Sequence, residues 1–392
     1  MTENAGKVSP GPDERVARVE WMEGAHAQAA EWRSLAGLPA PRRVIPADAT
    51  LTADAACRLA CEGTALLWRG DFQNARQLLQ AMARRLDRKA HGAGGSGPEY
   101  PEAFHRKRML QAQRARTLGM LLIPFDVGHV IPLRRAPEVR QACEEAHGLA
   151  AAPYVASLRE LLGLIGAHEW RKKGVDIPAL GGRIHAHYGV FSPVRGEYVA
   201  LVAETPLPAA LAAHSLAFDI GTGTGVLAAV LARRGIRQVL ATDQNARALA
   251  CARANVERLQ LGGQVELLQA DLFPPGRAPL VVCNPPWVPG KPSSALEYAV
   301  YDPDSRMLRG FLAGLAAHLA TGGEGWLILS DLAEHLRLRS RETLLGWIEA
   351  AGLQVLGRRD VRPTHAKAAD PDDPLHSARA AEITSLWRLG AA

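Results

Sequence analysis

The second half of this chain alternates short apolar runs with helical patterns, and this alternation limits the possible fold more than any other feature. The helical patterns at 226–234 and 246–259 end at Gly235 and at the Gly262-Gly263 pair, as helices commonly do. The pattern predicts an α/β fold with a parallel sheet covered by helices on both faces. The apolar runs lie at 217–220, 238–242, 265–268, 280–283 and 325–329.

Two late segments, 353–361 and 381–389, alternate polar and apolar residues more strictly. Strict alternation is typical of strands with one face in solvent, so we expect an antiparallel pair at one edge of the sheet.

The first half has a different texture. Residues 48–89, 137–147 and 155–170 read as helical, whereas 120–123 and 130–133 read as a short hairpin. The boundary falls at 171–183, where Gly174, Pro178, Gly181 and Gly182 gather. We therefore expect three parts, namely a disordered tail at 1–20, a mostly helical N-terminal domain at 45–170 and the α/β domain at 184–392.

A glycine-rich loop, Asp219–Gly225, follows the first apolar run of the α/β domain. Gly221, Gly223 and Gly225 let the backbone turn tightly and approach a ligand closely, at the sheet edge where such folds bind ligands. A dinucleotide site is the alternative, since counting from Gly223 satisfies the loose dinucleotide pattern. Asp219, two residues before the first glycine, favours S-adenosylmethionine, whose ammonium group a carboxylate can hold.

Two further acids follow the next apolar runs. Asp243 closes the second run, where a carboxylate can accept both ribose hydroxyls of an adenosine, although it could instead cap a helix. Asp271, followed by Leu272, comes after the third run and could accept from the adenine amino group, or be a plain turn residue.

The most specific motif is Asn284-Pro285-Pro286-Trp287, directly after the fourth run. The two prolines stop the strand and stiffen the loop. The Asn284 side chain and the Pro285 backbone each offer a carbonyl oxygen, and Trp287 offers a flat face. A proline-rich turn beneath a core tryptophan is the alternative interpretation.

This arrangement suits methylation of an amide or exocyclic amino nitrogen. The lone pair of such a nitrogen is delocalised, and two acceptors that bind its N–H groups favour a pyramidal nitrogen aimed at a methyl donor. The remaining work is alignment and charge placement, without a metal or a strong base.

With these motifs, residues 185–332 resemble the class I S-adenosylmethionine-dependent N-methyltransferases of the methyltransferase small-domain family. The resemblance implies a Rossmann-like, seven-stranded sheet. It also implies a cofactor site of Asp219, Gly221, Gly223, Gly225, Asp243, Asp271 and Leu272, with Asn284, Pro285, Pro286 and Trp287 as the catalytic residues.

Within that group, Asp271-Leu272-Phe273 followed by Asn-Pro-Pro resembles the glutamine methyltransferases of peptide-chain release factors. Residues 188–197 occupy a similar place to a motif of those enzymes, which makes Phe191, Arg195 and Glu197 substrate-side candidates. The tetrad ends in Trp287 where those enzymes usually have tyrosine, and their Pro-Arg-Pro-Glu-Thr-Glu pattern is absent. Residues 189–192 are also similar to ribosomal RNA guanine methyltransferases.

The composition adds modest limits. The formal net charge is +6, and a basic segment holds Arg106, Lys107, Arg108, Arg114 and Arg116, which could grip phosphates or line a solvated helix face. Five scattered cysteines favour a reducing cytoplasm, and no set of residues has metal-ligand spacing. No signal core or membrane span is apparent.

We therefore expect a methyl acceptor that is a macromolecule, either a protein glutamine, as in a release factor, or an RNA base, with the N-terminal domain presenting it. The alternatives are a small-molecule N-methyltransferase, in which that domain is a lid, and a non-catalytic module that only binds the cofactor.

Overall fold

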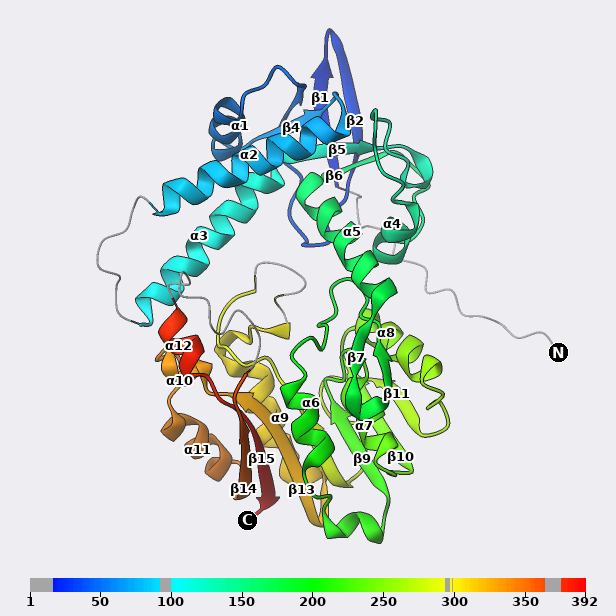
Figure 1. The fold of residues 1–392 in the computed structure, drawn as a ribbon, viewed down its shortest axis with the longest axis vertical. Helices are drawn as coiled ribbons and strands as arrows, with labels where there is room; N and C mark the ends of the chain where they lie inside the picture. The colour runs from blue at the N-terminus through cyan, green and yellow to red at the C-terminus, as the bar shows by residue number, and fades with distance from the viewer. Residues whose placement is uncertain (1–16, 92–99, 293–296, 298, 364–374) are drawn as a thin grey trace, which may run out of the picture. The chain divides into compact units, whose positions relative to one another are not determined.

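The computed structural model describes residues 17–91, 100–292, 297, 299–363 and 375–392. The chain divides into two compact units (Figure 1). One contains residues 1–93 and 111–165, and the other contains residues 94–110 and 166–392. The predicted tail at 1–20 lies outside the described residues up to residue 16, and Arg18 already belongs to a strand.

The first unit is built around a closed six-stranded barrel with the strand order β1-β2-β6-β5-β4-β3. The strands are β1 (Arg18–Glu23), β2 (His26–Trp32), β3 (Arg43–Ala47), β4 (Thr64–Trp68), β5 (Leu121–Phe125) and β6 (Tyr154–Ser157). The helices are α1 (Ala53–Cys61), α2 (Phe72–His91), α4 (Arg140–His147) and parts of α3 (Glu102–Gly119) and α5 (Leu158–Lys173), with a short 3-10 turn at Val127–His129.

The N-terminal domain expected at 45–170 is largely helical, but the barrel at its centre was not predicted. Residues 48–89, which read as one helical stretch, are two helices separated by β4, whose five residues are all buried. A short run that is apolar throughout cannot be told from a buried helical segment by periodicity alone, which is why β4 was missed.

The hairpin expected from 120–123 and 130–133 is also wrong. Residues 121–125 do form β5, but β5 pairs with β4 and β6, and a turn with His129 at φ +63° follows it. The barrel is closed largely by pairings between strands distant in sequence, which local patterns do not reveal.

The second unit is a seven-stranded sheet with helices on both faces (Figure 1). Its strands are β9 (Leu216–Ile220), β10 (Gln238–Asp243), β11 (Val265–Gln269), β12 (Ala278–Cys283), β13 (Leu319–Ser330), β14 (Leu353–Val361) and β15 (Thr384–Ala391). Its helices are α6 (Glu197–Glu204), α7 (Val226–Arg233), α8 (Ala246–Arg258), α9 (Arg306–His318), α10 (Leu332–His335), α11 (Arg341–Ala350) and α12 (His376–Ala381). A separate two-stranded ribbon pairs β7 (Val175–Ile177) with β8 (Gly182–Ile184), and short 3-10 turns lie at Pro178–Leu180, Ala209–Ala212 and Pro303–Ser305.

Two apolar cores cover the two faces of this sheet. One joins α6, α7 and α8 to side chains such as Ala217 and Val282, and the other joins α9 and α11 to Phe218 and Val281. Successive residues of each strand therefore enter opposite cores, as expected for strands buried on both faces.

The strand order is β11-β10-β9-β12-β13-β15-β14. The five strands from β11 to β13 run parallel, whereas β15 is antiparallel to both β13 and β14. This confirms the predicted α/β fold class and the antiparallel edge pair. From β9 the chain builds outward to β10 and β11, then returns to place β12 on the other side of β9. In open α/β sheets, ligands bind at the carboxyl ends of the strands at such a reversal.

Candidate functional site

The strand register brings the predicted loop, acid and tetrad to one edge of the sheet. Ile220, the last residue of β9, pairs with Thr242 of β10 on one side and with Cys283 of β12 on the other. The residues that follow these three are Gly221, Asp243 and Asn284. Residues predicted separately from three segments are therefore neighbours at the carboxyl ends of adjacent strands.

The glycine loop has the backbone form that the sequence predicted. Gly221, Gly223 and Gly225 have φ values of +72°, +55° and +80°, a region that L side chains rarely adopt. A Cβ atom at Gly221 would lie 2.5 Å from Cε of Met307, and one at Gly225 would lie 3.2 Å from Cβ of Ala252. The loop thus presents bare backbone, which fits the close approach of a cofactor.

Asp219 is buried beneath this loop, with 1% of its surface exposed. Its Oδ2 accepts hydrogen bonds from the Thr222 hydroxyl at 2.6 Å and from the backbone N–H of Ala228 at 3.0 Å. Burial raises the pKa of Asp219 to about 6, although these two hydrogen bonds oppose the shift. Asp219 therefore holds the loop against the start of α7 and carries a carboxylate that a cation would stabilise.

Asp243 connects the glycine loop to the end of β10. Its Oδ2 accepts from the N–H of Gly223 at 3.1 Å, and its Oδ1 accepts from the N–H of Asn245 at 2.9 Å. Burial raises the pKa of Asp243 above its ordinary value. The backbone N–H of Gln244 contributes a third hydrogen bond to this carboxylate. A carboxylate has about four lone-pair positions, so acceptor capacity remains that a ribose hydroxyl could use. The helix cap of α8 is supplied by Asn245, which removes the capping alternative for Asp243.

Asp271 and Leu272 lie beyond the end of β11. The Asp271 side chain is 73% exposed and stands 3.8 Å from the guanidinium of Arg306, which is itself 82% exposed. Leu272 has φ +74°, and its carbonyl accepts from the Thr242 hydroxyl at 2.5 Å. The adenine contact of Asp271 therefore stays a prediction. Its side chain is exposed, and the next residue, Leu272, is held to the end of β10 by the bond from Thr242.

The tetrad has an internal hydrogen bond that the sequence did not suggest. The indole N–H of Trp287 donates to Oδ1 of Asn284 at 2.8 Å. This bond sets which way the Asn284 amide faces and leaves its oxygen one further lone pair. Pro285 is buried and Pro286 half-buried, as expected for a loop stiffened beneath the site.

The substrate-side candidates separate into two groups. The guanidinium of Arg195 lies 4.9 Å from the ring centre of Trp287, and its Nε donates to Oε1 of Glu197 at 2.7 Å. Phe191 instead packs half-buried against the core on the α6–α7 face.

Two charged residues near the tetrad, Arg339 and Glu382, were missed by sequence analysis. The Arg339 guanidinium is buried and reaches the carbonyl of Trp287 at 3.5 Å, and burial lowers its pKa. Glu382 accepts from Arg195 at 3.0 Å. Neither belongs to a local motif, so their contacts could not be read from spacing along the chain.

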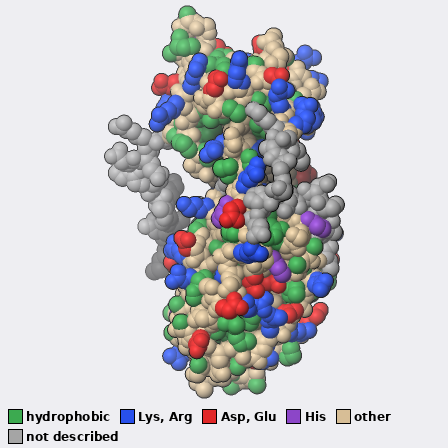
Figure 2. Space-filling model, turned by 90° about the vertical axis from the view of Figure 1, so that its left-hand side faces the viewer, with side chains coloured by type: hydrophobic (Ala, Val, Ile, Leu, Met, Phe, Trp, Pro, Cys, Tyr) green, Lys and Arg blue, Asp and Glu red, His purple; other side chains and the backbone are tan. Residues whose placement is uncertain are grey.

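The basic segment is only partly available for phosphates. Arg108 forms a two-pronged pair with Glu297, at 2.9 and 2.8 Å, and Arg114 forms one with Asp87, at 2.7 and 3.1 Å. On the face drawn in Figure 2, basic side chains are interspersed with acidic and apolar ones.

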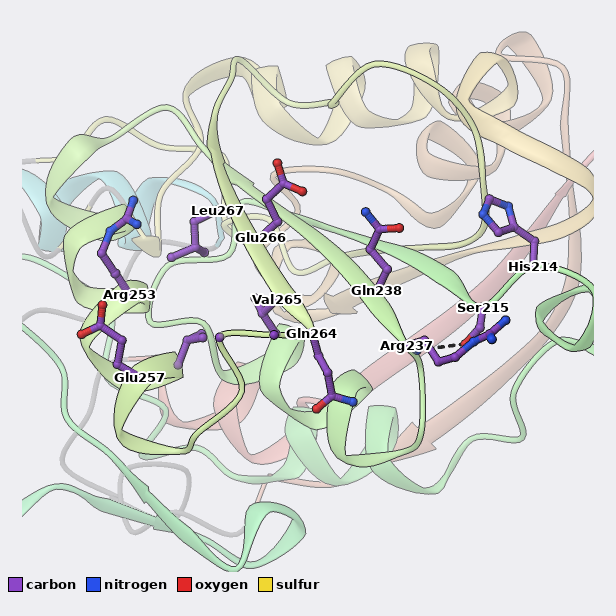
Figure 3. A pocket seen from close by; sticks show the side chains of 13 residues that line it. His214, Ser215, Arg237, Gln238, Arg253, Glu257, Gln264, Val265, Glu266 and Leu267 are labelled. Atoms are coloured by element: carbon purple, nitrogen blue, oxygen red, sulfur yellow. Dashed lines mark hydrogen bonds between the residues drawn. The ribbon is translucent and has the colours of Figure 1, made fainter. Parts of the chain in front are cut away.

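A hollow of about 840 Å³ lies elsewhere on this unit, along β11 (Figure 3). It is lined by residues such as Ser215 and Gln238 at the amino ends of β9 and β10, and by Arg253 and Glu257 of α8. Because the glycine loop and tetrad lie at the carboxyl ends, this hollow is not part of the candidate site.

Three general features of the described ranges bear on the site. None of their helices combines the length and apolar character needed to cross a bilayer. Within the same ranges, His, Cys, Asp and Glu side chains do not gather in threes as a metal site would require. All five cysteines are free.

Comparison with known proteins agrees with the family that the sequence motifs predicted. Residues 181–341 match the methyltransferase small domain family. A release factor glutamine methyltransferase of Gloeobacter violaceus is 35% identical over 153 residues, which is 33% of this chain and 54% of that protein. A ribosomal protein L11 methyltransferase of Pelotomaculum thermopropionicum is 44% identical over 69 residues, which is 17% of this chain and 22% of that protein.

Among solved structures, a ribosomal protein L11 methylase from Lactobacillus delbrueckii subsp. bulgaricus is 16% identical and covers 53% of this chain and 84% of that one, with a TM-score of 0.35. The chain spans about half the length, or less, of the curated relatives it matches. The family match confirms the predicted family, enzyme class and cofactor for residues 181–341, which match a methyltransferase domain of the kind that uses S-adenosylmethionine.

Proposed function

We propose that this protein methylates the side-chain amide nitrogen of a glutamine in a protein substrate such as a peptide-chain release factor. The observation that carries the proposal is the position of Asn284. The hydrogen bond from Trp287 orients its side-chain oxygen. Asn284 and Gly221 directly follow Cys283 and Ile220, which pair across β12 and β9, so Asn284 lies beside the start of the glycine loop.

The cofactor would supply an electrophilic methyl group on a sulfonium, and Gly221, Gly223, Gly225 and Asp243 would hold it. The chain's own task is then to make an amide nitrogen nucleophilic. The free lone pair on Asn284 Oδ1 and the Pro285 carbonyl accept the two N–H groups of the substrate amide. These contacts favour a pyramidal nitrogen whose lone pair points away from its own carbonyl.

With the donor bound, formation of the N–C bond would break its S–C bond, and the substrate nitrogen would become cationic and acidic. One of its protons is then lost, and it can leave by way of Asn284 or Pro285 to solvent. Acceptors already aimed at the nitrogen stabilise this developing charge without reorganising, which is the main source of rate enhancement expected here.

The surroundings of Trp287 favour an amide over a nucleobase. Arg195 covers one face of the indole at 4.9 Å, and side chains from three apolar clusters pack against the ring. A nucleobase needs an open aromatic face on which to stack, whereas an amide needs only two acceptors. The similarity to release factor glutamine methyltransferases supports the same choice.

The test is transfer of a labelled methyl group from S-adenosylmethionine to a purified bacterial release factor. We expect mass spectrometry to find the added mass on one glutamine, and Asn284→Ala to slow its appearance roughly 100-fold. Label from a cell lysate that disappears after RNase treatment would instead identify RNA as the acceptor. Label in the dialysable fraction would identify a small molecule, and either result would refute the proposal.

A further inference from the structure

We infer that Glu382, between α12 and β15, is a positioning residue that orients Asn284 through Arg195 and Trp287. The predicted effect on turnover rests on the proposed function. The positioning itself does not, because it can be observed without any acceptor.

Glu382 is a buried carboxylate with an unused oxygen. Its side chain is 0% exposed, and its Oε1 accepts from Arg195 at 3.0 Å and from the Ser330 hydroxyl at 2.7 Å. Its Oε2 is buried and has no hydrogen-bond partner. Burying a carboxylate is costly unless it is fully paired, so folding alone does not account for an acid here.

What Glu382 does achieve is to fix the plane of Arg195. The guanidinium is planar, and it donates from Nε to Glu197 and from a terminal nitrogen to Glu382. Two carboxylates on two edges of the group leave it little freedom to rotate. In that plane the guanidinium lies 4.9 Å from the ring centre of Trp287.

Trp287 passes this constraint to the tetrad. Its indole N–H donates to Oδ1 of Asn284 at 2.8 Å, so the tilt of the ring decides where that oxygen points. A shift of the ring would weaken the bond and let the Asn284 amide rotate. The proposed chemistry depends on the direction of that oxygen, and small misplacements of such groups are expensive.

The chain also contains a matched control in the middle of β13. Glu324 is a carboxylate of low exposure that accepts from Arg388 at 2.7 and 2.5 Å and from the indole N–H of Trp326 at 3.0 Å. It reproduces the same combination of acid, arginine and tryptophan within the same sheet. Ser330, the partner of Glu382, closes the carboxyl end of the same strand.

The test follows the indole N–H signals of the protein labelled with ¹⁵N-tryptophan, assigning Trp287 by its loss in Trp287→Phe. We expect Glu382→Gln to move the Trp287 signal and leave that of Trp326 in place. Glu324→Gln should do the reverse. A Trp287 signal that does not move in Glu382→Gln overturns the inference, whatever the enzyme methylates.

Turnover gives a second readout on a release factor. We expect Glu382→Gln to lower kcat about tenfold, with the dissociation constant of S-adenosylhomocysteine unchanged, because the effect passes through an oriented group. Glu382→Gln added to Asn284→Ala should cost nothing further, since residues acting through one contact are not additive. Full additivity, or an equal loss in Glu324→Gln, would show a merely structural role.

Failure of the proposed function and failure of the positioning role give different results. If the wild-type protein leaves release factors unmethylated, the proposed function fails and the indole signals alone decide the positioning. If Glu382→Gln does not fold, Ser330→Ala removes one hydrogen bond from the same carboxylate oxygen. A smaller movement of the Trp287 signal then supports the inference, and no movement overturns it.

Discussion

The indole N–H of Trp287 donates a 2.8 Å hydrogen bond to the side-chain oxygen of Asn284, three residues earlier in the chain. A flat aromatic face was the role expected of Trp287. The hydrogen bond adds a second role, because only a ring with a donor at this place can orient the amide. A phenylalanine would keep the flat face and lose the donor.

The first prediction separates these roles. Asn284→Ala should lower turnover roughly 100-fold, a loss similar to that of one preorganised polar partner elsewhere, and should leave cofactor affinity unchanged. Trp287→Phe should lower turnover by a smaller factor, because Asn284 remains but is less well oriented. Single-turnover rates with saturating cofactor measure both. Near-normal turnover in a folded, cofactor-bound Asn284→Ala protein would exclude the tetrad as the catalytic centre.

The second prediction concerns the cofactor. Asp243→Ala should weaken binding of S-adenosylhomocysteine by about 1–3 kcal/mol, the cost of losing hydrogen bonds to a charged group. It also removes the acceptor that holds the N–H of Gly223. The measurement is a thermal-shift titration, since a ligand that binds only the folded state raises its melting temperature.

Two comparisons accompany that titration. Asp271→Ala should have the smaller effect, because Asp271 is 73% exposed and its contacts compete with water. NAD should leave the wild-type melting temperature unchanged. A shift with NAD and none with S-adenosylhomocysteine would mean that the glycine loop holds a dinucleotide.

The parts of this site that the sequence predicted are those that local chemistry determines. Asp219, Gly221 and Asn284 each follow a recognisable apolar run, and the ends of parallel strands meet at one edge of a sheet. Placing these residues in space required only the strand order, the ability of glycine to adopt positive φ and the tendency of proline to end a strand.

What the sequence did not reveal depends on contacts between distant segments. Arg195 and Glu382 are 187 positions apart, and no local sequence pattern around either residue indicates that the two are in contact. The barrel was missed for a related reason. β2 pairs with β6 and β1 with β3, and the all-buried β4 and β5 lack the alternation that marks a strand with one exposed face.

The third prediction follows from the raised pKa of Asp219, which burial places at about 6. In the unliganded protein its contribution to stability is complete below the ordinary value of 3.8 and is lost as the pH rises through about 6. A bound cation stabilises the ionised form and lowers this pKa. Cofactor affinity should therefore rise between pH 5 and pH 7, by at most about tenfold per pH unit, and then level off.

Calorimetric titration of S-adenosylmethionine near pH 5.5, in two buffers with different heats of ionisation, tests this. We expect release of a fraction of a proton on binding, and none in Asp219→Asn. Proton uptake, or an affinity independent of pH across this window, would show that Asp219 does not face the cofactor's charge.

The last prediction concerns Arg108, which belongs to the basic segment that the sequence left open between phosphate contacts and a solvated helix face. Its guanidinium donates to both oxygens of Glu297 and to the carbonyl of Lys291 at 2.8 Å, and lies 4.0 Å from the ring centre of Tyr301. Hydrogen bonding to Glu297 raises the pKa of Arg108. Arg108 therefore holds residues of the segment that follows the tetrad. In the same segment, Val288 forms a β-bridge with Tyr301.

Arg108→Lys should keep the charge and lose the two-pronged geometry, because a lysine is a single point donor. We expect the KM for the acceptor to rise several-fold, with cofactor affinity unchanged, since a two-pronged, partly buried ion pair of this kind contributes about 1–2 kcal/mol. Arg114→Lys is the matched control. Arg114 lies on α3 as Arg108 does, and it forms a similar two-pronged pair, with Asp87 of α2. Equal effects from both substitutions would mean that α3 acts only through general stability. If the protein does bind RNA, a flatter salt dependence in the charge-removing variants Arg108→Gln and Arg114→Gln would show that these arginines contact phosphates.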